Sequence, residues 1–247
     1  MNISRMRQEI KLRYNKLNSN HKPDLPDAYL DDFINDAINE YVEIFYSGNN
    51  LKKYKFGFEV TQQRIDMLSN LVVPLKSIVA NKVATGVYKF NLNTLTPKYK
   101  HFLRGIIKPN ICNYQIPINI VTHNNLDKKL KNENTKPNNK WLRCLGTFKS
   151  EGNDSALYLY VDSSITSNTL DVELEYLRQP TKVFSGGYNS LEFITGDTSA
   201  YKITDAPVSS EILYPTVVVD IVVQNLARVL EDPNKLSLFN DKITNTT

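Results

Sequence analysis

Apolar side chains crowd one stretch near the end of the sequence, VVVDIVVQNLARVL at residues 217–230. Polar residues recur four positions apart along it, at Thr216, Asp220, Gln224 and Arg228, and in a helix this spacing places them in one narrow stripe. The rest of the circumference is apolar, so such a helix needs cover on two or more sides. We expect part of that cover to come from the same chain and part from a neighbouring copy of it. The stretch is short and contains charged residues, so it is not a membrane span.

Two further helices are predicted at the start of the chain, where apolar residues recur at steps of three and four. The first covers residues 3–18 and is basic, and the second covers residues 26–46 and has an acidic outer face. Two interpretations are open. The charges of a helical hairpin face water, where each exposed pair contributes at most about 1 kcal/mol, or the acidic face of one subunit meets a basic face of the next.

The middle of the chain alternates apolar and polar residues in short runs, which predicts strands. The runs are YKFGFEVTQQ, the two halves of KSIVANKVATGVYKFNL, IPINIVT, WLRCLGTFKS, SALYLYVDS and LDVELEYLRQP. The last three predict an antiparallel sheet with one buried face. Pro97 stands at a helix-start position and predicts a helix over residues 97–108. The polar stretch 123–140 predicts a loop, preceded by no more than one helical turn.

These elements predict an α+β fold. A helical bundle, made of the N-terminal helical hairpin and the C-terminal apolar helix, carries an inserted antiparallel β-rich domain. We expect the hairpin in residues 1–51, the β-rich domain in 52–180, a linker and the returning helix in 181–232, and an extended docking tail in 233–247. An apolar tail without helical periodicity is typical of a segment that docks on another surface.

Charge is segregated along the chain, although the net charge is only +4. Residues 76–149 contain fourteen basic and two acidic side chains, whereas residues 150–247 contain six basic and fourteen acidic ones. A split of this kind indicates nucleic acid nearby or an oppositely charged partner surface. The candidates for contact with a DNA channel or a partner are Lys128, Lys129, Lys131, Lys136, Lys140 and Arg143.

The sequence contains little that suggests catalysis. His21, His101 and His123 lie in different predicted elements, without the spacing of a metal site or a catalytic triad. No GxxxxGK or GxGxxG motif occurs. Cys112 and Cys144 lie far apart and are expected to be buried thiols of a reducing compartment. We therefore expect neither an enzyme nor a cofactor nor a metal site, and the charged N-terminus predicts no secretory signal.

The order of parts resembles that of a known family. LPDAYLDDFINDAINEYVEIF, the strand end VELEYLRQPTKV and the helix LYPTVVVDIVVQNLARVLEDP together resemble the head-to-tail connector (adaptor) ring proteins of tailed bacteriophages, most closely those of crAss-like phages. The resemblance implies a virion protein, assembled in the bacterial cytoplasm as a ring of about twelve copies. It also implies contact with the portal protein or an adjacent ring, and a channel for packaging and ejection of double-stranded DNA.

The predicted function is therefore a structural ring component that joins capsid to tail. The predicted subunit or partner interface consists of Val218, Val222, Leu226, Val229, Leu236, Leu238, Phe239, Asp32, Asp36, Arg7 and Arg178. The alternative is a non-enzymatic nucleic-acid-binding protein that uses the basic segment 76–149. A third hypothesis, a hydrolase, requires clustered acids or histidines, which the sequence does not suggest.

Overall fold

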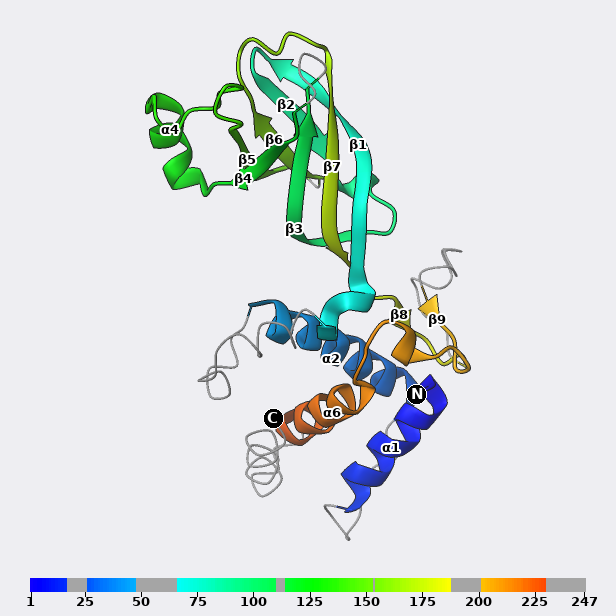
Figure 1. The fold of residues 1–247 in the computed structure, drawn as a ribbon. Helices are drawn as coiled ribbons and strands as arrows, with labels where there is room; N and C mark the ends of the chain where they lie inside the picture. The colour runs from blue at the N-terminus through cyan, green and yellow to red at the C-terminus, as the bar shows by residue number, and fades with distance from the viewer. Residues whose placement is uncertain (17–25, 48–65, 110–113, 153, 188–200, 230–247) are drawn as a thin grey trace. The chain divides into compact units, whose positions relative to one another are not determined.

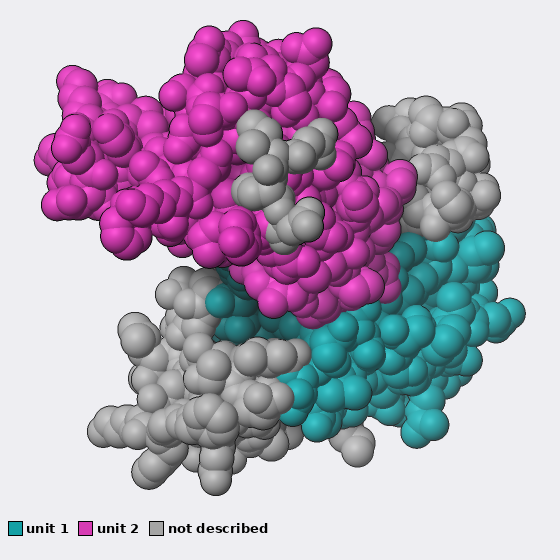
Figure 2. Space-filling view, turned by 45° about the horizontal axis from the view of Figure 1, so that its top comes forward, with its two compact units in different colours: residues 1–71, 180–247 teal, residues 72–179 magenta. Residues whose placement is uncertain are grey.

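A computed structural model describes residues 1–16, 26–47, 66–109, 114–152, 154–187 and 201–229. The chain divides into two compact units, residues 1–71 with 180–247, and residues 72–179. They are shown in separate colours in Figure 2. Each unit is described by itself.

Unit 1 is built on three helices, α1 (Ile3–Lys16), α2 (Asp27–Ser47) and α6 (Pro215–Val229). Figure 1 shows α1 and α6 on the same side of α2. The helices predicted over residues 3–18, 26–46 and 217–230 are thereby confirmed as far as the structure describes these segments. No helix of the described residues is long and apolar enough to cross a membrane.

Helix α6 is covered by its own chain, because α1 and α2 both pack against it. Val218, Val222 and Leu226 are at most 1% exposed, while Val229 at the helix end is 63% exposed. The apolar circumference therefore needs no neighbouring copy to cover it up to residue 227. The expectation that one copy of the chain cannot bury this helix by itself is therefore wrong.

Charged side chains of unit 1 pair between its own helices. Arg7 of α1 lies 2.7 Å from the Asp27 carboxylate of α2 and 3.5 Å from that of Asp31. Arg13 of α1 bonds to Asp220 of α6. Basic α1 and the start of acidic α2 thus meet within one chain, and this accounts for part of the charge pattern that the sequence left open.

A short parallel pair, β8 (Lys182–Val183) and β9 (Tyr201–Lys202), completes the described part of unit 1 together with η1 (Ser69–Leu71) and η4 (Val208–Ser210). Lys202 and Glu211 form a buried ion pair of 3.1 Å. The Thr181 hydroxyl donates to the same carboxylate at 2.6 Å. A buried charge without its partner is costly, so these groups hold the segment in one arrangement.

Unit 2 is a closed barrel of seven strands. The strands are β1 (Val72–Ala84), β2 (Val87–Asn91), β3 (Tyr99–Lys108), β4 (Ile116–Ile120), β5 (Cys144–Glu151), β6 (Asp154–Tyr160) and β7 (Thr169–Arg178), with η2 (Leu92–Thr94) after β2. The order around the barrel is β1, β2, β6, β5, β4, β3, β7, and β7 returns to β1. Figure 1 shows these strands side by side in one curved sheet.

The predicted fold class is therefore wrong. The molecule is not a helical bundle with an inserted antiparallel β-rich domain, because the β part is a closed barrel of mixed strand direction. Strands β4 and β5 pair in parallel, and all other neighbours in the barrel are antiparallel. Because the barrel is closed, it has no unpaired edge strand. An open sheet has two such edges and must protect them against pairing with other chains.

The predicted helix over residues 97–108 is also wrong, because β3 occupies residues 99–108 and pairs along its length with β7. Aromatic and β-branched residues in HFLRGIIK favour a strand, and pairing between strands overrides the helix-start signal of Pro97. The last three predicted strands are confirmed as β5, β6 and β7. β7 does not pair with the hairpin of β5 and β6, however, and lies between β1 and β3.

The barrel interior is filled by inward-facing side chains that alternate along the strands. Buried members include Ala80, Tyr88, Ile107, Leu157, Val172 and Tyr176. The Tyr176 hydroxyl donates to the Pro97 carbonyl at 2.8 Å. Tyr88 donates in the same way to the Ser167 carbonyl at 2.6 Å. Both tyrosines thus bury their rings while satisfying their hydroxyl groups, as buried tyrosines usually do.

A helix lies in the stretch predicted to be a loop. Helix α4 (His123–Lys131) connects β4 to β5, which run parallel and therefore need a crossover between their ends. Leu126 packs with Val121 and Leu145 in a small apolar cluster, with Leu130 and Tyr160 at its border. The apolar side of α4 therefore packs against the outside of the barrel, and its polar side is exposed.

Candidate functional site

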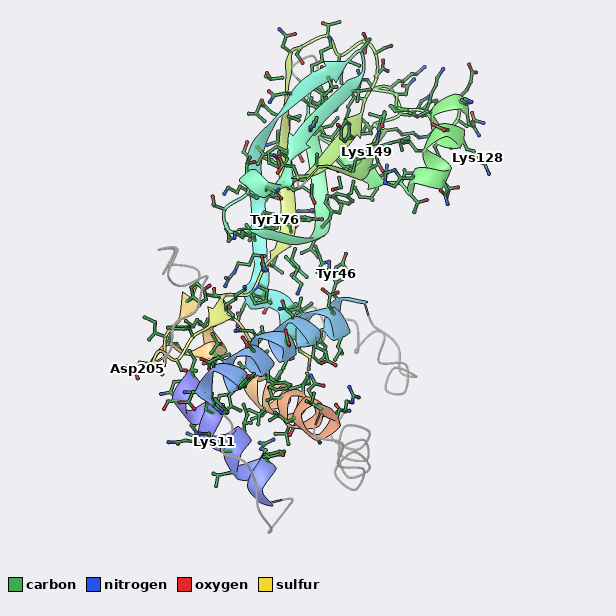
Figure 3. The ribbon with its side chains drawn as sticks, turned by 180° about the vertical axis from the view of Figure 1, so that it is seen from behind. Lys11, Tyr46, Lys128, Lys149, Tyr176 and Asp205 are labelled. Carbon is green, nitrogen blue, oxygen red and sulfur yellow. The ribbon has the colours of Figure 1, made fainter. Side chains whose placement is uncertain are left out.

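The predicted basic residues gather on one part of unit 2. We call residues 123–143, which comprise α4 and the segment that follows it, the basic lobe; it contains six basic and two acidic side chains. Figures 1 and 3 show α4 standing off the barrel beside β4 and β5. The label in Figure 3 places Lys128 at the outer edge of this lobe. The lobe contains all six side chains predicted to face a DNA channel or a partner.

Most cations of the lobe have no carboxylate partner. No salt bridge within the described part of the chain involves Lys128, Lys129, Lys131, Lys140 or Arg143. Lys136 differs, because it lies 3.6 Å from the Glu133 carboxylate. Lys128, Lys131 and Lys140 are exposed, and Lys129 and Arg143 are half-buried. The unpaired charges are available to an anionic ligand.

Several lysines on the barrel wall are, in contrast, engaged by neighbours. Lys82 donates to the Thr166 carbonyl at 3.2 Å, and Lys108 forms an ion pair with Glu173. Lys149, labelled in Figure 3, lies 4.7 Å from the centre of the Tyr158 ring and donates to the Tyr160 hydroxyl at 3.1 Å. These contacts restrain the ammonium groups, so the lobe differs from the wall in having cations that are unpaired.

A cavity of about 510 Å³ lies where the lobe meets the barrel. Its apolar lining comes from Phe102, Ile118, Ile120 and Leu145, and its polar lining from Asn119, Lys129, Asn134, Thr135 and Arg143. Lys129 of α4 and Arg143 of the turn that follows therefore line the same cavity. Such a site accommodates a single anionic group whose neighbouring part is apolar.

A tight turn ends the lobe and exposes Trp141. The backbone N–H of Asn138 donates to the Arg143 carbonyl at 3.1 Å, and that of Arg143 donates back at 3.0 Å. The Trp141 side chain is 64% exposed, and the Lys140 ammonium lies 5.9 Å from its ring centre. The sequence prediction missed Trp141, although an aromatic residue between Lys140 and Arg143 was the available signal.

A neighbouring loop holds this turn in place. Asp162 accepts hydrogen bonds from the backbone N–H groups of Ser164 at 2.9 Å and Asn139 at 3.0 Å. The Asn139 amide donates to the Ser164 hydroxyl at 2.9 Å. Hydrogen bonding to the Ser164 backbone N–H is the main cause that lowers the pKa of Asp162 below its ordinary value. The charged carboxylate thus connects the turn to the loop after β6.

The predicted interface residues differ in burial and are divided between the two units. Val218, Val222 and Leu226 are buried in unit 1, Val229 is exposed, and Arg7 is bound to Asp27 and Asp31. Asp32 and Asp36 are exposed on α2, and Arg178 is half-buried at the end of β7 in unit 2. Leu236, Leu238, Phe239 and the predicted docking tail lie outside the described residues, as does the strand predicted over residues 54–63.

The described residues contain no group of three or more histidine, cysteine, aspartate or glutamate side chains that could hold a metal ion. His101 lies on β3 and His123 begins α4. Cys144 is fully buried, and this burial raises the pKa of its thiol well above the ordinary value. A protonated, buried thiol is a poor nucleophile.

Comparison of the sequence with models of known protein families and with curated proteins finds no match to this chain.

Proposed function

We propose that the basic lobe contacts the phosphate backbone of nucleic acid, without reading base sequence and without catalysis. The observation that carries this proposal is the gathering of six cations on one lobe, five of which form no salt bridge within the described part of the chain. Binding of phosphates by lysine and arginine releases counterions, so a diffuse set of cations is sufficient for affinity. The cavity lined by Lys129 and Arg143 adds a place where one phosphate reaches two cations.

The resemblance to connector proteins supplies the setting that we propose for this contact. In a virion ring between portal and tail, the nucleic acid is double-stranded DNA in passage. Burial of α6 within its own chain gives the ring no support. The charge difference between the two units favours assembly. Unit 2 contains fifteen basic and eight acidic residues and has a net charge of +7. Unit 1 contains fifteen basic and eighteen acidic residues and has a net charge of −3. The exposed carboxylates of Asp32 and Asp36 in one copy can pair with the basic lobe of a second copy.

Binding of a labelled DNA duplex tests the backbone contact. We expect binding to weaken linearly in log affinity against log salt, with a slope of about −0.9 for each phosphate contact. The variant Lys128→Gln, Lys131→Gln, Lys140→Gln is expected to bind roughly tenfold or more weakly at about 0.05 M salt, with a shallower slope. The control is Lys76→Gln, Lys82→Gln, Lys108→Gln, which removes the same charge from the barrel wall.

Equal loss of binding in the two variants would show that net charge, and not the lobe, determines the contact. Absence of binding by the parent protein at low salt would exclude the proposed function. The ring is tested separately, by the mass of the purified protein with and without portal protein over a range of salt concentrations. A monomer under every condition would exclude the ring while leaving the backbone contact intact.

A further inference from the structure

The turn at residues 138–143 is built to present one aromatic side chain. The Asn138 side-chain oxygen accepts hydrogen bonds from the backbone N–H groups of Lys140 at 2.8 Å and Trp141 at 3.4 Å. The Leu142 N–H donates to the Asn139 carbonyl at 3.2 Å. These hydrogen bonds fix the backbone on both sides of Trp141, so the backbone of the turn loses little freedom when a ligand binds.

Leu142 adopts a left-handed conformation with φ of 51°, which residues other than glycine seldom adopt. Strain of this kind persists only where the surroundings enforce it, and it clusters at ligand-binding positions. Here the bridge between Asn138 and Arg143 and the bonds of Asn139 to Asp162 and Ser164 enforce it. The strained residue directly follows the exposed tryptophan.

The surroundings of Trp141 define what it can bind. Lys140 and Arg143 lie within two residues of it, and Arg143 also lines the cavity at the base of the lobe. A ligand that suits this place needs negative charge for the cations and a flat π face for the ring. A nucleotide with an unpaired base has both, because every base can stack on an aromatic side chain while its phosphate meets a lysine.

We propose that Trp141 stacks on an unpaired base of single-stranded nucleic acid whose phosphates the basic lobe holds. This inference rests on the proposed backbone contact alone, and not on the proposed ring with double-stranded DNA, and it adds a preference for single strands. In a duplex the bases are already stacked on one another and leave no free face in reach. The preference is independent of sequence, since stacking makes no use of the hydrogen-bonding edges of a base.

The chain provides its own probe, because Trp141 is the single tryptophan of the sequence. Its fluorescence is measured while an oligothymidylate of about 20 nucleotides, or a duplex of the same length, is added at low salt. We expect the single strand to quench the emission and the duplex to leave it nearly unchanged. Anisotropy of labelled DNA, which does not depend on tryptophan, reports binding in parallel.

Substitution separates stacking from apolar contact. Trp141→Ala is expected to weaken single-strand binding roughly 5- to 150-fold, the range of one stacked base, and to change duplex binding less than about twofold. Trp141→Phe keeps a π face and should retain part of the affinity, whereas Trp141→Leu keeps apolar bulk and should not. Because the side chain is exposed, circular dichroism should show all three variants folded.

The outcomes distinguish the two proposals. Binding of both nucleic acids without quenching, and with Trp141→Ala unaffected, overturns the stacking and leaves the backbone contact standing. Binding of neither overturns both. A blue shift of the emission with rising protein concentration in the absence of nucleic acid assigns Trp141 to a contact between copies of the chain and overturns the stacking as well.

Discussion

Replacement of Val222 by alanine tests the finding that α6 is covered by its own chain. Val222 is 0% exposed, and the substitution removes two buried methyl groups. Their transfer free energy is about 1.6 kcal/mol at roughly 0.8 kcal/mol for each. A cavity that only partly collapses adds about 1 kcal/mol, and the better helix propensity of alanine returns roughly 0.5 kcal/mol. We expect a net loss of about 2 kcal/mol in the free energy of unfolding.

The matched control is Val229→Ala, because the same change then occurs at a position of the same helix that is 63% exposed. Its expected effect is within about 0.5 kcal/mol of zero. Unfolding in urea is followed by helical circular dichroism. With an m-value of about 2 kcal/mol/M, the midpoint of Val222→Ala should fall by about 1 M and that of Val229→Ala should hardly move.

The same experiment identifies what covers the helix when it is repeated over an approximately tenfold range of protein concentration at about 1 M salt, which screens charge pairing between copies. Cover from the same chain makes the midpoint independent of concentration, whereas cover from a neighbouring copy makes it rise with concentration. Equal losses in the two variants, or a midpoint that rises with concentration, would refute the account of α6 given by the structure.

Two further predictions concern unit 2. A Cβ at Gly146 would lie 2.7 Å from Ile118 Cγ2 and 3.0 Å from Ile120 Cδ1. Gly146→Ala should therefore destabilise the barrel by about 1 to 3 kcal/mol. An unchanged urea midpoint would show that β4 shifts to accommodate the methyl group without loss of stability. The pKa of Asp162 is lowered in the fold, so its charged form stabilises the turn above the unfolded value of about 3.9, and this contribution is lost as the pH falls through the folded value. The parent should therefore have a higher urea midpoint than Asp162→Asn at pH about 6, and the difference should shrink below pH about 4; a difference that grows on acidification contradicts the role of the carboxylate.

The sequence by itself determined those helices and strands whose pattern of apolar and polar residues is complete within one short segment. The three helices of unit 1 follow from apolar residues at steps of three and four, and β5 and β6 follow from alternation over a hairpin. The gathering of basic side chains is also a property of the sequence, since six of them fall within residues 123–143. These features need no knowledge of distant parts of the chain.

Tertiary structure alone decided which strands are neighbours, and therefore the fold class. β7 could have continued the hairpin of β5 and β6, but it pairs with β1 and β3, and this arrangement closes the barrel around Tyr88, Val172 and Tyr176. Pairing along β7 likewise turned residues 99–108 into a strand despite Pro97. Long-range backbone hydrogen bonds outweigh local propensities, which differ by at most about 1 kcal/mol for each residue.

The cover of α6 and the presentation of Trp141 were decided in the same way. An apolar circumference in the sequence shows that cover is needed, but not which chain supplies it, and α1 and α2 turned out to be sufficient. Trp141 is exposed on a turn that hydrogen bonds of Asn138, Asn139 and Asp162 hold in place. Sequence gives the chemical character of each surface, whereas packing between distant segments determines which surfaces remain open to a partner.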